Sequence, residues 1–427
     1  MAREKIIVGF DVGSSKISTL IATSSEETLT VIGVSTVTSK GIRKGQVVDI
    51  DEAVSSIAES LEAAERMGGV SVSSCFISVG GAHISSVNSR GVVAVAGGEN
   101  EIGEDDVRRV IEAAQAISVP SSREIIHVIP RDYIVDSQEG VKDPVGMTGV
   151  RLEVETHIIT GAATAIRNLV KCVQQVGIDV DGLVFSGIAS AESVLTDTEK
   201  ELGVALVDIG GGTTDVALFV DGSIAHSVVI PIGGRNITND LAIGLRSSLE
   251  TAEKIKLALS EKERRLSEEE KENSISKVGK KEDTLDISKL EIGEDIGTLS
   301  RKTLTEGIIK PRLTEISTLI GMEIKRAGFA GLLPAGLVIT GGAASTMLLS
   351  QVGKDVLRMP VRVAEPRGVI GLIDEISSPA YSTAVGLLLY GEKISVVAPR
   401  IGVGLPHGRG LVELVKKLVT KLRGLLP

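Results

Sequence analysis

The 427-residue chain has no tryptophan and only 2% aromatic residues. It therefore lacks the stacked aromatic platforms that commonly hold single-stranded nucleic acid. Its formal net charge of −10 also opposes binding to a polyanion. We expect no nucleic-acid partner. The hydrophobic fraction of 42% is that of an ordinary globular protein, so the predicted cores are built from Ile, Val, Leu and Ala.

Cysteine is equally scarce. Cys75 and Cys172 lie in apolar, periodic segments, which predicts buried free thiols rather than a disulfide or metal ligands. The histidines His83, His127 and His157 are too scattered for a metal site.

No secretion signal precedes the first strand, and no run reaches the roughly 18 apolar residues of a membrane-spanning helix. A reducing, cytoplasmic compartment is predicted, with any membrane contact made from the side.

Glycine, by contrast, is abundant, and three glycines stand in a row. An apolar strand over 204–207 ends on Asp208, is followed by Gly210, Gly211, Gly212, Thr213 and Thr214, and continues as a second strand over 216–220. Glycines have no Cβ, so their N–H groups can approach an anion closely. The stretch predicts a phosphate-binding hairpin, although a single copy could also be an ordinary glycine-rich turn.

The same pattern occurs near the N-terminus. A strand over 6–8 runs into Asp11, Gly13, Ser14, Ser15 and Lys16, and a second strand follows over 17–22. Two copies of a strand, an aspartate, a glycine turn and a strand suggest two similar halves. Each half would offer one hairpin to a shared anion.

Between the two copies lies a stretch of different character. A strand over 29–37 and a helix capped by Asp51 and ended by Gly68 complete the first unit. Residues 83–160 then predict a small βαββ subdomain, with strands over 92–96, 125–129 and 150–159, a helix over 104–116 and a loop over 138–149. Residues 261–305 are polar and aperiodic, which fits a solvated surface insert or a dedicated binding surface.

The C-terminal segment 411–426 has the pattern of an amphipathic helix. Leu411, Val415, Leu418, Leu422 and Leu425 share one stripe, and the flanking positive charges are Lys416, Lys417, Lys421 and Arg423. At about 24 Å it is too short to span a bilayer but suited to lie in the interface. A helix docked on the protein's own surface is the alternative.

Several motifs together carry a resemblance to known proteins. They are the two hairpins, the helix 190–192 before the second hairpin, and Gly341 and Gly342 after a strand over 337–340. This set is similar to the nucleotide site shared by actin, the seventy-kilodalton heat-shock chaperones and sugar kinases. Over nearly its whole length the chain resembles the FtsA family of bacterial cell-division proteins, most specifically in segments 41–49, 143–147, 233–240 and 378–381.

The resemblance implies an α/β fold of actin-like type, with two lobes built on duplicated ribonuclease H-like halves and a small βαββ insert. It implies the following division: lobe I from 1–82, 161–207 and 380–396; the inserted subdomain from 83–160; lobe II from 208–254 and 306–379; a lobe II insert from 255–305; a linker from 397–410; and the amphipathic helix from 411–427.

The resemblance also implies an ATP or ADP site with Mg²⁺. Asp11 and Asp208 would hold the metal through water, and Glu192 would orient the attacking water. The implied nucleotide-binding residues are Gly13, Ser14, Ser15, Lys16, Gly210, Gly211, Gly212, Thr213, Thr214, Gly233, Gly234, Asn236, Glu253, Lys256, Gly341, Gly342 and Ala343. Glu192→Ala is expected to slow hydrolysis while leaving ATP binding in place.

The function implied is that of a scaffold, a slow ATPase that polymerises on the cytoplasmic face of the cell membrane at the division site. Its expected partners are further copies of itself, the C-terminal tail of the tubulin-like protein FtsZ, anionic lipid and downstream division proteins. Because segment 261–305 departs from the family's usual sequence, the FtsZ contact is not assigned to residues. Two alternatives remain: an actin-like component of type IV pilus assembly and a small-molecule kinase of the same superfamily.

Overall fold

Two large sheets share one strand pattern. The computed structural model describes residues 5–25, 28–272, 283–285, 290, 293–294 and 299–397. In lobe I the strands have the order β11-β6-β1-β2-β3, and in lobe II the order β18-β17-β12-β13-β14. In each sheet three strands are antiparallel and two more continue parallel to the first of them. The repeated order and direction identify two duplicated halves.

The bounds of these strands place the two predicted hairpins at equivalent positions. In lobe I they are β1 (Lys5–Val12), β2 (Lys16–Ser25), β3 (Thr28–Thr38), β6 (Ser74–Val79) and β11 (Asp179–Phe185). In lobe II they are β12 (Val204–Ile209), β13 (Thr214–Val220), β14 (Ser223–Ile230), β17 (Gly336–Thr340) and β18 (Val361–Val363).

Two strands shift the expected lobe boundaries. Residues 204–208 of β12 pair with both β13 and β17, so lobe II begins at Val204 rather than at Asp208. The short β19 (Ile370–Gly371) pairs with β3 of lobe I, although 306–379 was expected in lobe II. Backbone pairing therefore divides the chain differently from the division that the resemblance implied.

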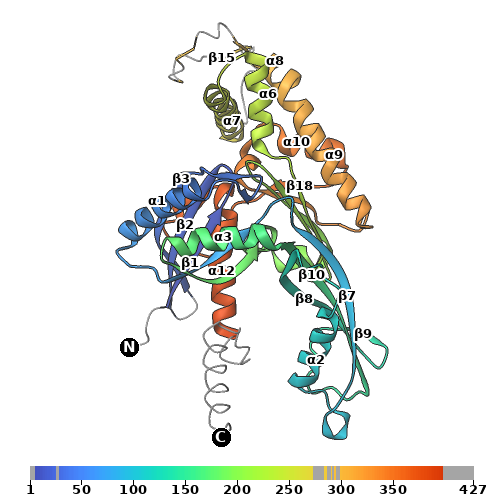
Figure 1. Ribbon diagram of the computed structural model, residues 1–427. Coiled ribbons are helices and arrows are strands. Elements are labelled where there is room, and N and C mark those ends of the chain that lie inside the picture. The colour runs from blue at the N-terminus through green and yellow to red at the C-terminus, as the bar shows by residue number, and fades with distance from the viewer. Residues whose placement is uncertain are drawn as a thin grey trace, which may run out of the picture.

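The inserted subdomain has a sheet of its own. Its strands have the order β7-β10-β8-β9 and its helix α2 covers one face; the bounds are β7 (Ser85–Ala94), α2 (Glu104–Gln115), β8 (Arg123–Val135), β9 (Gln138–Val141) and β10 (Arg151–Ala162). The prediction of a loop over 138–149 was wrong in its first part, since β9 pairs with β8 there. Ile102, Val110 and Leu152 belong to a separate core. Figure 1 shows this insert at one end of the molecule, with α6, α7 and α8 at the other.

The helices assigned to lobe I come from before and after the insert in the sequence. They are α1 (Ile50–Gly68), α3 (Ala163–Gln175), α4 (Ser186–Val194), α5 (Asp197–Leu202), a 3-10 turn (Pro379–Tyr381) and α12 (Ser382–Val397). Asp49, not Asp51, caps α1, because its carboxylate accepts from the N–H of Glu52 at 3.0 Å. Helix α12 packs against α4 and β1 (Figure 1). The two cysteines are free and buried, as predicted.

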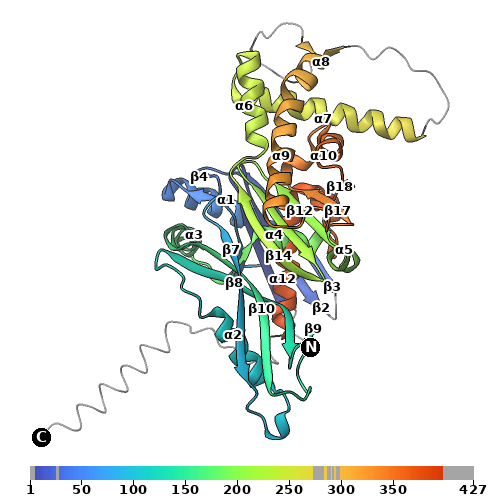
Figure 2. The ribbon, with the colours of Figure 1, turned by 90° about the vertical axis from the view of Figure 1, so that its right-hand side faces the viewer.

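The lobe II helices lie above the second sheet (Figure 2). They are α6 (Gly234–Leu245), α7 (Leu249–Glu272), α8 (Arg301–Leu304), a π-helix (Thr305–Ile309), α9 (Lys310–Arg326), a 3-10 helix (Gly342–Ser345) and α10 (Leu349–Leu357). The short α11 (Ile373–Ile376) instead contacts β3 of lobe I, and its Ile376 belongs to the lobe I core. The remaining short elements are β4 (Ile42–Arg43), β5 (Gln46–Val47), β15 (Thr284–Leu285), β16 (Leu299–Ser300) and a 3-10 turn (Gly98–Asn100).

Some predicted segments lie outside the described residues. These are most of the linker 397–410, the whole amphipathic helix 411–427 and much of the polar run 261–305. Within the described part of the chain, no helix combines the length and the hydropathy needed to cross a membrane.

Candidate functional site

The tips of the two hairpins touch across the lobes. In one tip the N–H of Gly13 donates to the carbonyl of Lys16 at 3.0 Å, and in the other the N–H of Gly210 donates to the carbonyl of Thr213 at 2.9 Å. A Cβ on Gly211 would lie 1.9 Å from Ser15 Oγ. Only glycine allows so close an approach without displacing the facing hairpin.

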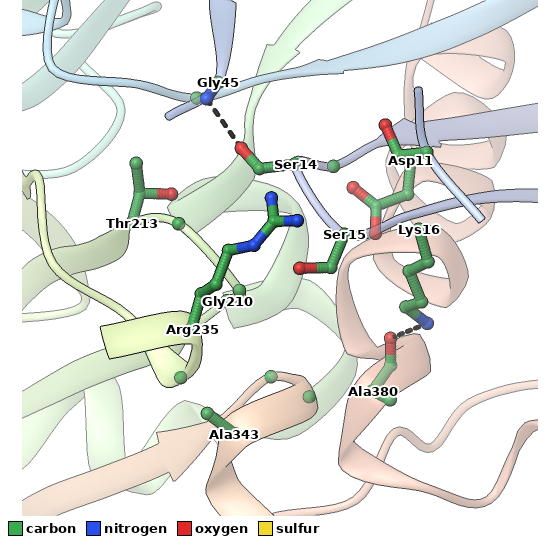
Figure 3. A pocket seen from close by; sticks show the side chains of 18 of the residues that line it. Asp11, Ser14, Ser15, Lys16, Gly45, Gly210, Thr213, Arg235, Ala343 and Ala380 are labelled. Carbon is green, nitrogen blue, oxygen red and sulfur yellow. Dashed lines mark hydrogen bonds between the residues drawn. The ribbon is translucent and has the colours of Figure 1, made fainter. Parts of the chain in front are cut away.

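A third segment holds the first hairpin in place. The N–H of Gly45, between β4 and β5, donates to Ser14 Oγ at 2.8 Å (Figure 3). Gly45 has φ +73°, and a Cβ there would lie 2.6 Å from the carbonyl oxygen of Gly80. This contact accounts for the glycine-flanked motif at 41–49, whose role could not be read from the sequence.

A cleft of about 690 Å³ opens between the lobes at these hairpins. Its size suits a small organic ligand. Most of the predicted site residues line it: Asp11, Gly13, Ser14, Ser15, Lys16, Asp208, Gly210, Gly211, Gly212, Thr213, Gly234, Glu253, Lys256, Gly341, Gly342 and Ala343.

Three other predicted binding residues support the cleft from outside. Thr214 is buried and donates its hydroxyl to the carbonyl of Ile232 at 2.8 Å. Gly233 lies under the hairpin, where a Cβ would approach Gly210 O to 2.6 Å. The amide oxygen of Asn236 accepts from the N–H of Gly233 at 3.0 Å. These residues build the hairpin and the start of α6, and they do not line the cleft.

Three carboxylates face the cleft with raised pKa values. Burial raises the pKa of Asp11 to about 6, with the charge of Asp208 adding to it and Lys16 opposing it. Burial also raises the pKa of Asp208, although Ser190 and Thr383 donate hydrogen bonds to it, the latter at 2.9 Å. The pKa of Asp215 lies well above its usual range because of burial and the charges of Asp208 and Asp11.

Asp215 was missing from the predicted site. It is directly opposite Asp208 in the β12–β13 register, so both side chains lie on one face of the sheet. Its Oδ1 is buried without a hydrogen-bond partner in the described structure. The pairing rule of an antiparallel hairpin was the sequence signal that could have identified it. A buried carboxylate in this state favours a cation nearby.

The carboxylates do not form a complete metal cage. Within the described ranges, no group of three or more His, Cys, Asp or Glu residues is placed to hold a metal ion. A cation here would therefore need ligands from phosphate oxygens and water, which is how Mg²⁺ commonly binds.

Lys16 is held by the motif at 378–381. Its Nζ donates to the carbonyl of Ala380 at 2.6 Å and lies 4.1 Å from the centre of the Tyr381 ring. Burial lowers its pKa, although Asp11 and Asp208 oppose that shift. Lys16 of lobe I is thus held in place near the carboxylates of Asp11 and Asp208.

The far wall of the cleft comes from α7 and the glycine turn after β17. Lys256 is buried and donates to Glu253 at 2.7 Å and to Thr238 at 3.0 Å. Gly341 has φ +90°, and a Cβ there would lie 2.2 Å from Asp208 Oδ1. This turn brings bare backbone against the acidic face of the cleft.

The assignment of Glu192 to catalysis is not supported by its position. Its carboxylate pairs with Lys393 and, at 3.7 Å, with Lys200, and it does not line the cleft. Two residues earlier on α4, Ser190 points to Asp208 instead. A helix turns about 100° per residue, so the two side chains face nearly opposite directions. Ser186, at the start of α4, lines the cleft.

Comparison with known protein families gives two matches along the chain. Residues 81–160 match the family model for the SHS2 domain inserted in FtsA. Residues 205–386 match the model for the cell-division protein FtsA.

Curated relatives match at higher coverage. The chain is 41% identical to the cell division protein FtsA of Pseudomonas aeruginosa, over 91% of this chain and 89% of that protein. It is 38% identical to FtsA of Bacillus subtilis, over 95% and 88%. It is 36% identical to FtsA of Escherichia coli K12, over 91% of each chain.

Solved structures agree on the fold at low sequence identity. The PilM–PilN type IV pilus biogenesis complex gives a TM-score of 0.62 at 13% identity, covering 90% of this chain and 98% of that one. MreB5 of Spiroplasma citri bound to ADP gives 0.51 at 13% identity, covering 91% and 97%. The α/β fold is therefore the actin-like fold, as predicted, and the insert expected at 83–160 corresponds to the SHS2 domain.

Proposed function

The chain belongs to the FtsA family of cell-division proteins, and from that membership we propose that it is an ATP-binding scaffold that polymerises at the cytoplasmic membrane and anchors the FtsZ ring. The observation that carries the proposal is the cleft where two glycine hairpins from duplicated lobes meet. Family membership also sets aside the pilus-assembly and small-molecule-kinase alternatives.

The chemistry of the cleft supports a nucleotide with a divalent cation. The glycine hairpins, whose backbone a ligand can approach closely, are suited to phosphate oxygens, and bare backbone at Gly342 and Ala343 is suited to a base or ribose. Its charged lining residues comprise five acids and four bases: Asp11, Asp208, Asp215, Glu250 and Glu253 against Lys16, Arg235, Lys254 and Lys256. A polyphosphate would not be neutralised by this lining alone. The similar structures of MreB5 bound to ADP and to AMPPNP support the same ligand class.

Asp11 and Asp208 fit the role of outer ligands to Mg²⁺, and Asp215 adds a buried carboxylate oxygen without a partner. When bound, Mg²⁺ supplies positive charge to the phosphates. Asp11 and Asp208 would orient its water ligands through fixed side chains, since Ser78 donates to Asp11 at 2.9 Å and Thr383 to Asp208.

Hydrolysis is proposed to be slow. The cleft-lining residue of α4 is Ser186, whose hydroxyl is a weaker hydrogen-bond acceptor than a carboxylate, while Glu192 is engaged by two lysines. Positioning of the attacking water is one of the few things a side chain can add to phosphoryl transfer. The nucleotide would act mainly as a clamp between the lobes.

Nucleotide binding can be tested with full-length protein by calorimetric titration of Mg-ATP and Mg-ADP. We expect Asp208→Asn to weaken binding at least tenfold, because its carboxylate faces the hairpins and the metal position. Asp51→Asn removes a charge from the exposed first turn of α1 and should leave binding unchanged. Failure of the unaltered protein to bind either nucleotide would refute the ATP-binding proposal.

Membrane anchoring is proposed from the sequence of 411–427. Each of Lys416, Lys417, Lys421 and Arg423 could add on the order of 1 kcal/mol near an anionic leaflet. Sedimentation with anionic and with neutral liposomes should show binding only to the former, and lose it when 411–427 is removed. Equal sedimentation with and without that segment would defeat the anchor.

Polymerisation and the FtsZ contact remain further parts of the proposal. Negative-stain microscopy on an anionic lipid monolayer, with ATP, ADP or no nucleotide, should show filaments in the ATP sample. Titration with a peptide of the FtsZ C-terminal tail tests the partner directly. Absence of filaments in all three samples would count against the scaffold.

A further inference from the structure

We propose that Arg235 is a phosphate-binding residue that reaches from lobe II across the cleft to the phosphate chain of the nucleotide. The inference rests on the proposed nucleotide binding and adds to it a residue that the hairpin motifs do not contain. Arg235 is the second residue of α6, and its backbone N–H donates to the carbonyl of Gly211 at 2.8 Å. The start of α6 is thereby fixed to the tip of the lobe II hairpin.

The side chain of Arg235 extends into the cleft. Figure 3 shows its guanidinium between the lobe I hairpin, at Ser14 and Ser15, and the lobe II hairpin, at Gly210 and Thr213. The two tips are in contact beside it, since a Cβ on Gly212 would lie 3.0 Å from Ser14 Oγ. The guanidinium therefore lies beside the point where the two hairpin tips meet.

The other cations that line the cleft already have partners. Lys16 is held by the Ala380 carbonyl and the Tyr381 ring, Lys254 pairs with Glu250 at 3.0 Å, and Lys256 pairs with Glu253 at 2.7 Å. Arg235 has no hydrogen bond or ion pair to a described residue through its side chain. It is thus the cleft cation left available for a ligand within the described structure.

A guanidinium in this position is well suited to a phosphate. Its planar fork can donate two parallel hydrogen bonds to one phosphate group, which a lysine ammonium cannot match. Because Arg235 belongs to lobe II and faces the serines of lobe I, a phosphate held by both would join the lobes. Binding should therefore depend on Arg235 more for ATP and ADP than for AMP.

The test compares the unaltered full-length protein with Arg235→Gln, Arg235→Lys and the control Arg246→Gln. Arg246 is an exposed arginine at the opposite end of α6 and does not line the cleft. Affinities for Mg-ATP, Mg-ADP and AMP are measured by calorimetry, and thermal unfolding without nucleotide checks that each variant folds.

We expect Arg235→Gln to weaken Mg-ATP and Mg-ADP binding about tenfold or more, with a smaller effect on AMP. Arg235→Lys should be intermediate, and Arg246→Gln should match the unaltered protein. If the unaltered protein binds Mg-ATP and Arg235→Gln binds it equally well, the role of Arg235 is refuted while nucleotide binding stands. If the unaltered protein binds no nucleotide, the proposed function itself fails.

Discussion

Asp215 buries a carboxylate oxygen that has no hydrogen-bond partner in the described part of the chain. Its neighbours Asp208 and Asp11 are also acidic and raise its pKa further. An unpaired buried acid costs stability whether it is ionised or protonated. Asp215 lies in the cleft between the two lobes, where a bound cation would offset the negative charge of its carboxylate.

Replacing Asp215 should therefore stabilise the free protein. We expect Asp215→Asn to raise the free energy of unfolding by about 1–3 kcal/mol without nucleotide or Mg²⁺. The asparagine amide has nearly the same volume as the carboxyl group but cannot carry its negative charge. Thermal unfolding in a chelator at pH 8 measures the effect. Asp181→Asn, at a position within β11 that does not line the cleft, is the control. A lower unfolding temperature for Asp215→Asn would contradict the argument.

The buried His127 makes the free energy of unfolding depend on pH, and the direction of that dependence follows from its lowered pKa. Its Nε2 accepts from the N–H of Phe185 at 2.9 Å, and burial lowers its pKa to about 4 from an ordinary value near 6.5. The unfolded chain takes up the proton first, so the contribution is complete above pH 6.5 and is lost as the pH falls towards 4.

This predicts a smaller acid sensitivity for His127→Gln, which keeps an acceptor but cannot titrate. Between pH 7 and pH 5 the unaltered protein should lose about 2 kcal/mol more of its unfolding free energy than the variant. Urea unfolding at pH 7, 6 and 5 measures the difference. Parallel pH profiles for the two proteins would show that His127 titrates normally.

Single residues also show where sequence reasoning succeeds. The hairpin residues around Asp11 and Asp208 could be predicted because their chemistry is local, an acid followed by glycines and hydroxyls. Glu192 could not be placed, because its direction depends on how α4 is rotated against α12. Arg235 was overlooked because the Gly-Gly-Arg-Asn motif shows where a helix begins and not where its side chain points.

At the scale of elements, α4 and α12 form the support behind the acidic face of the cleft. Ser190 of α4 and Thr383 of α12 both donate to Asp208. The helices approach so closely that a Cβ on Gly386 would lie 1.7 Å from the carbonyl oxygen of Ala189. The position of Asp208 therefore depends on a glycine within α12.

We expect Gly386→Ala to destabilise the protein by about 1–3 kcal/mol, although alanine favours an isolated helix, because the new methyl group meets backbone that cannot rotate away. Gly353→Ala is the matched control. It also lies inside a helix, α10, but its Cβ would be 3.5 Å from a Val361 methyl group. Urea unfolding should show a loss only for Gly386→Ala, and equal stability of both variants would contradict this account of the contact.

Regular elements with strong periodicity could be predicted closely, as for β18 over 361–363 and α2 from Glu104. The strand β9 was not predicted, since Gln138–Val141 is exposed along most of its length and contains a glycine. Its pairing with β8 supplies what the local pattern lacks. The two-residue strand β19 was also not predicted, because it is a strand only through its pairing with β3, which is far away in the sequence.

At the scale of the whole molecule, the insert is attached to both lobes at one end and has its own core at the other. Ile126, Ile129 and Ile159 pack against the lobe I core. A polar group at the junction joins the insert to β14 of lobe II: Asn88 Nδ2 donates to the carbonyl of Ala225 at 3.1 Å, and His157 Nε2 lies 2.9 Å from Ser227 Oγ. No local sequence pattern could have predicted this placement.

The junction predicts that the insert can be loosened from lobe II without unfolding. Asn88 contacts both His157, at 2.6 Å, and β14, so Asn88→Ala removes a central partner and leaves buried polar atoms unpaired. Hydrogen exchange should then become faster in β7 and β14, while the insert core around Val110 and Leu152 keeps its protection. Asn239→Ala, on the exposed side of α6, should change neither region.

None of the junction residues Asn88, His157, Ala225 and Ser227 lines the cleft, so Asn88→Ala should also leave Mg-ATP affinity unchanged. Faster exchange throughout the chain would mean that the junction supports the whole fold rather than the orientation of the insert. Unchanged exchange in β7 and β14 would mean that the apolar contacts of the insert with lobe I alone hold it in place.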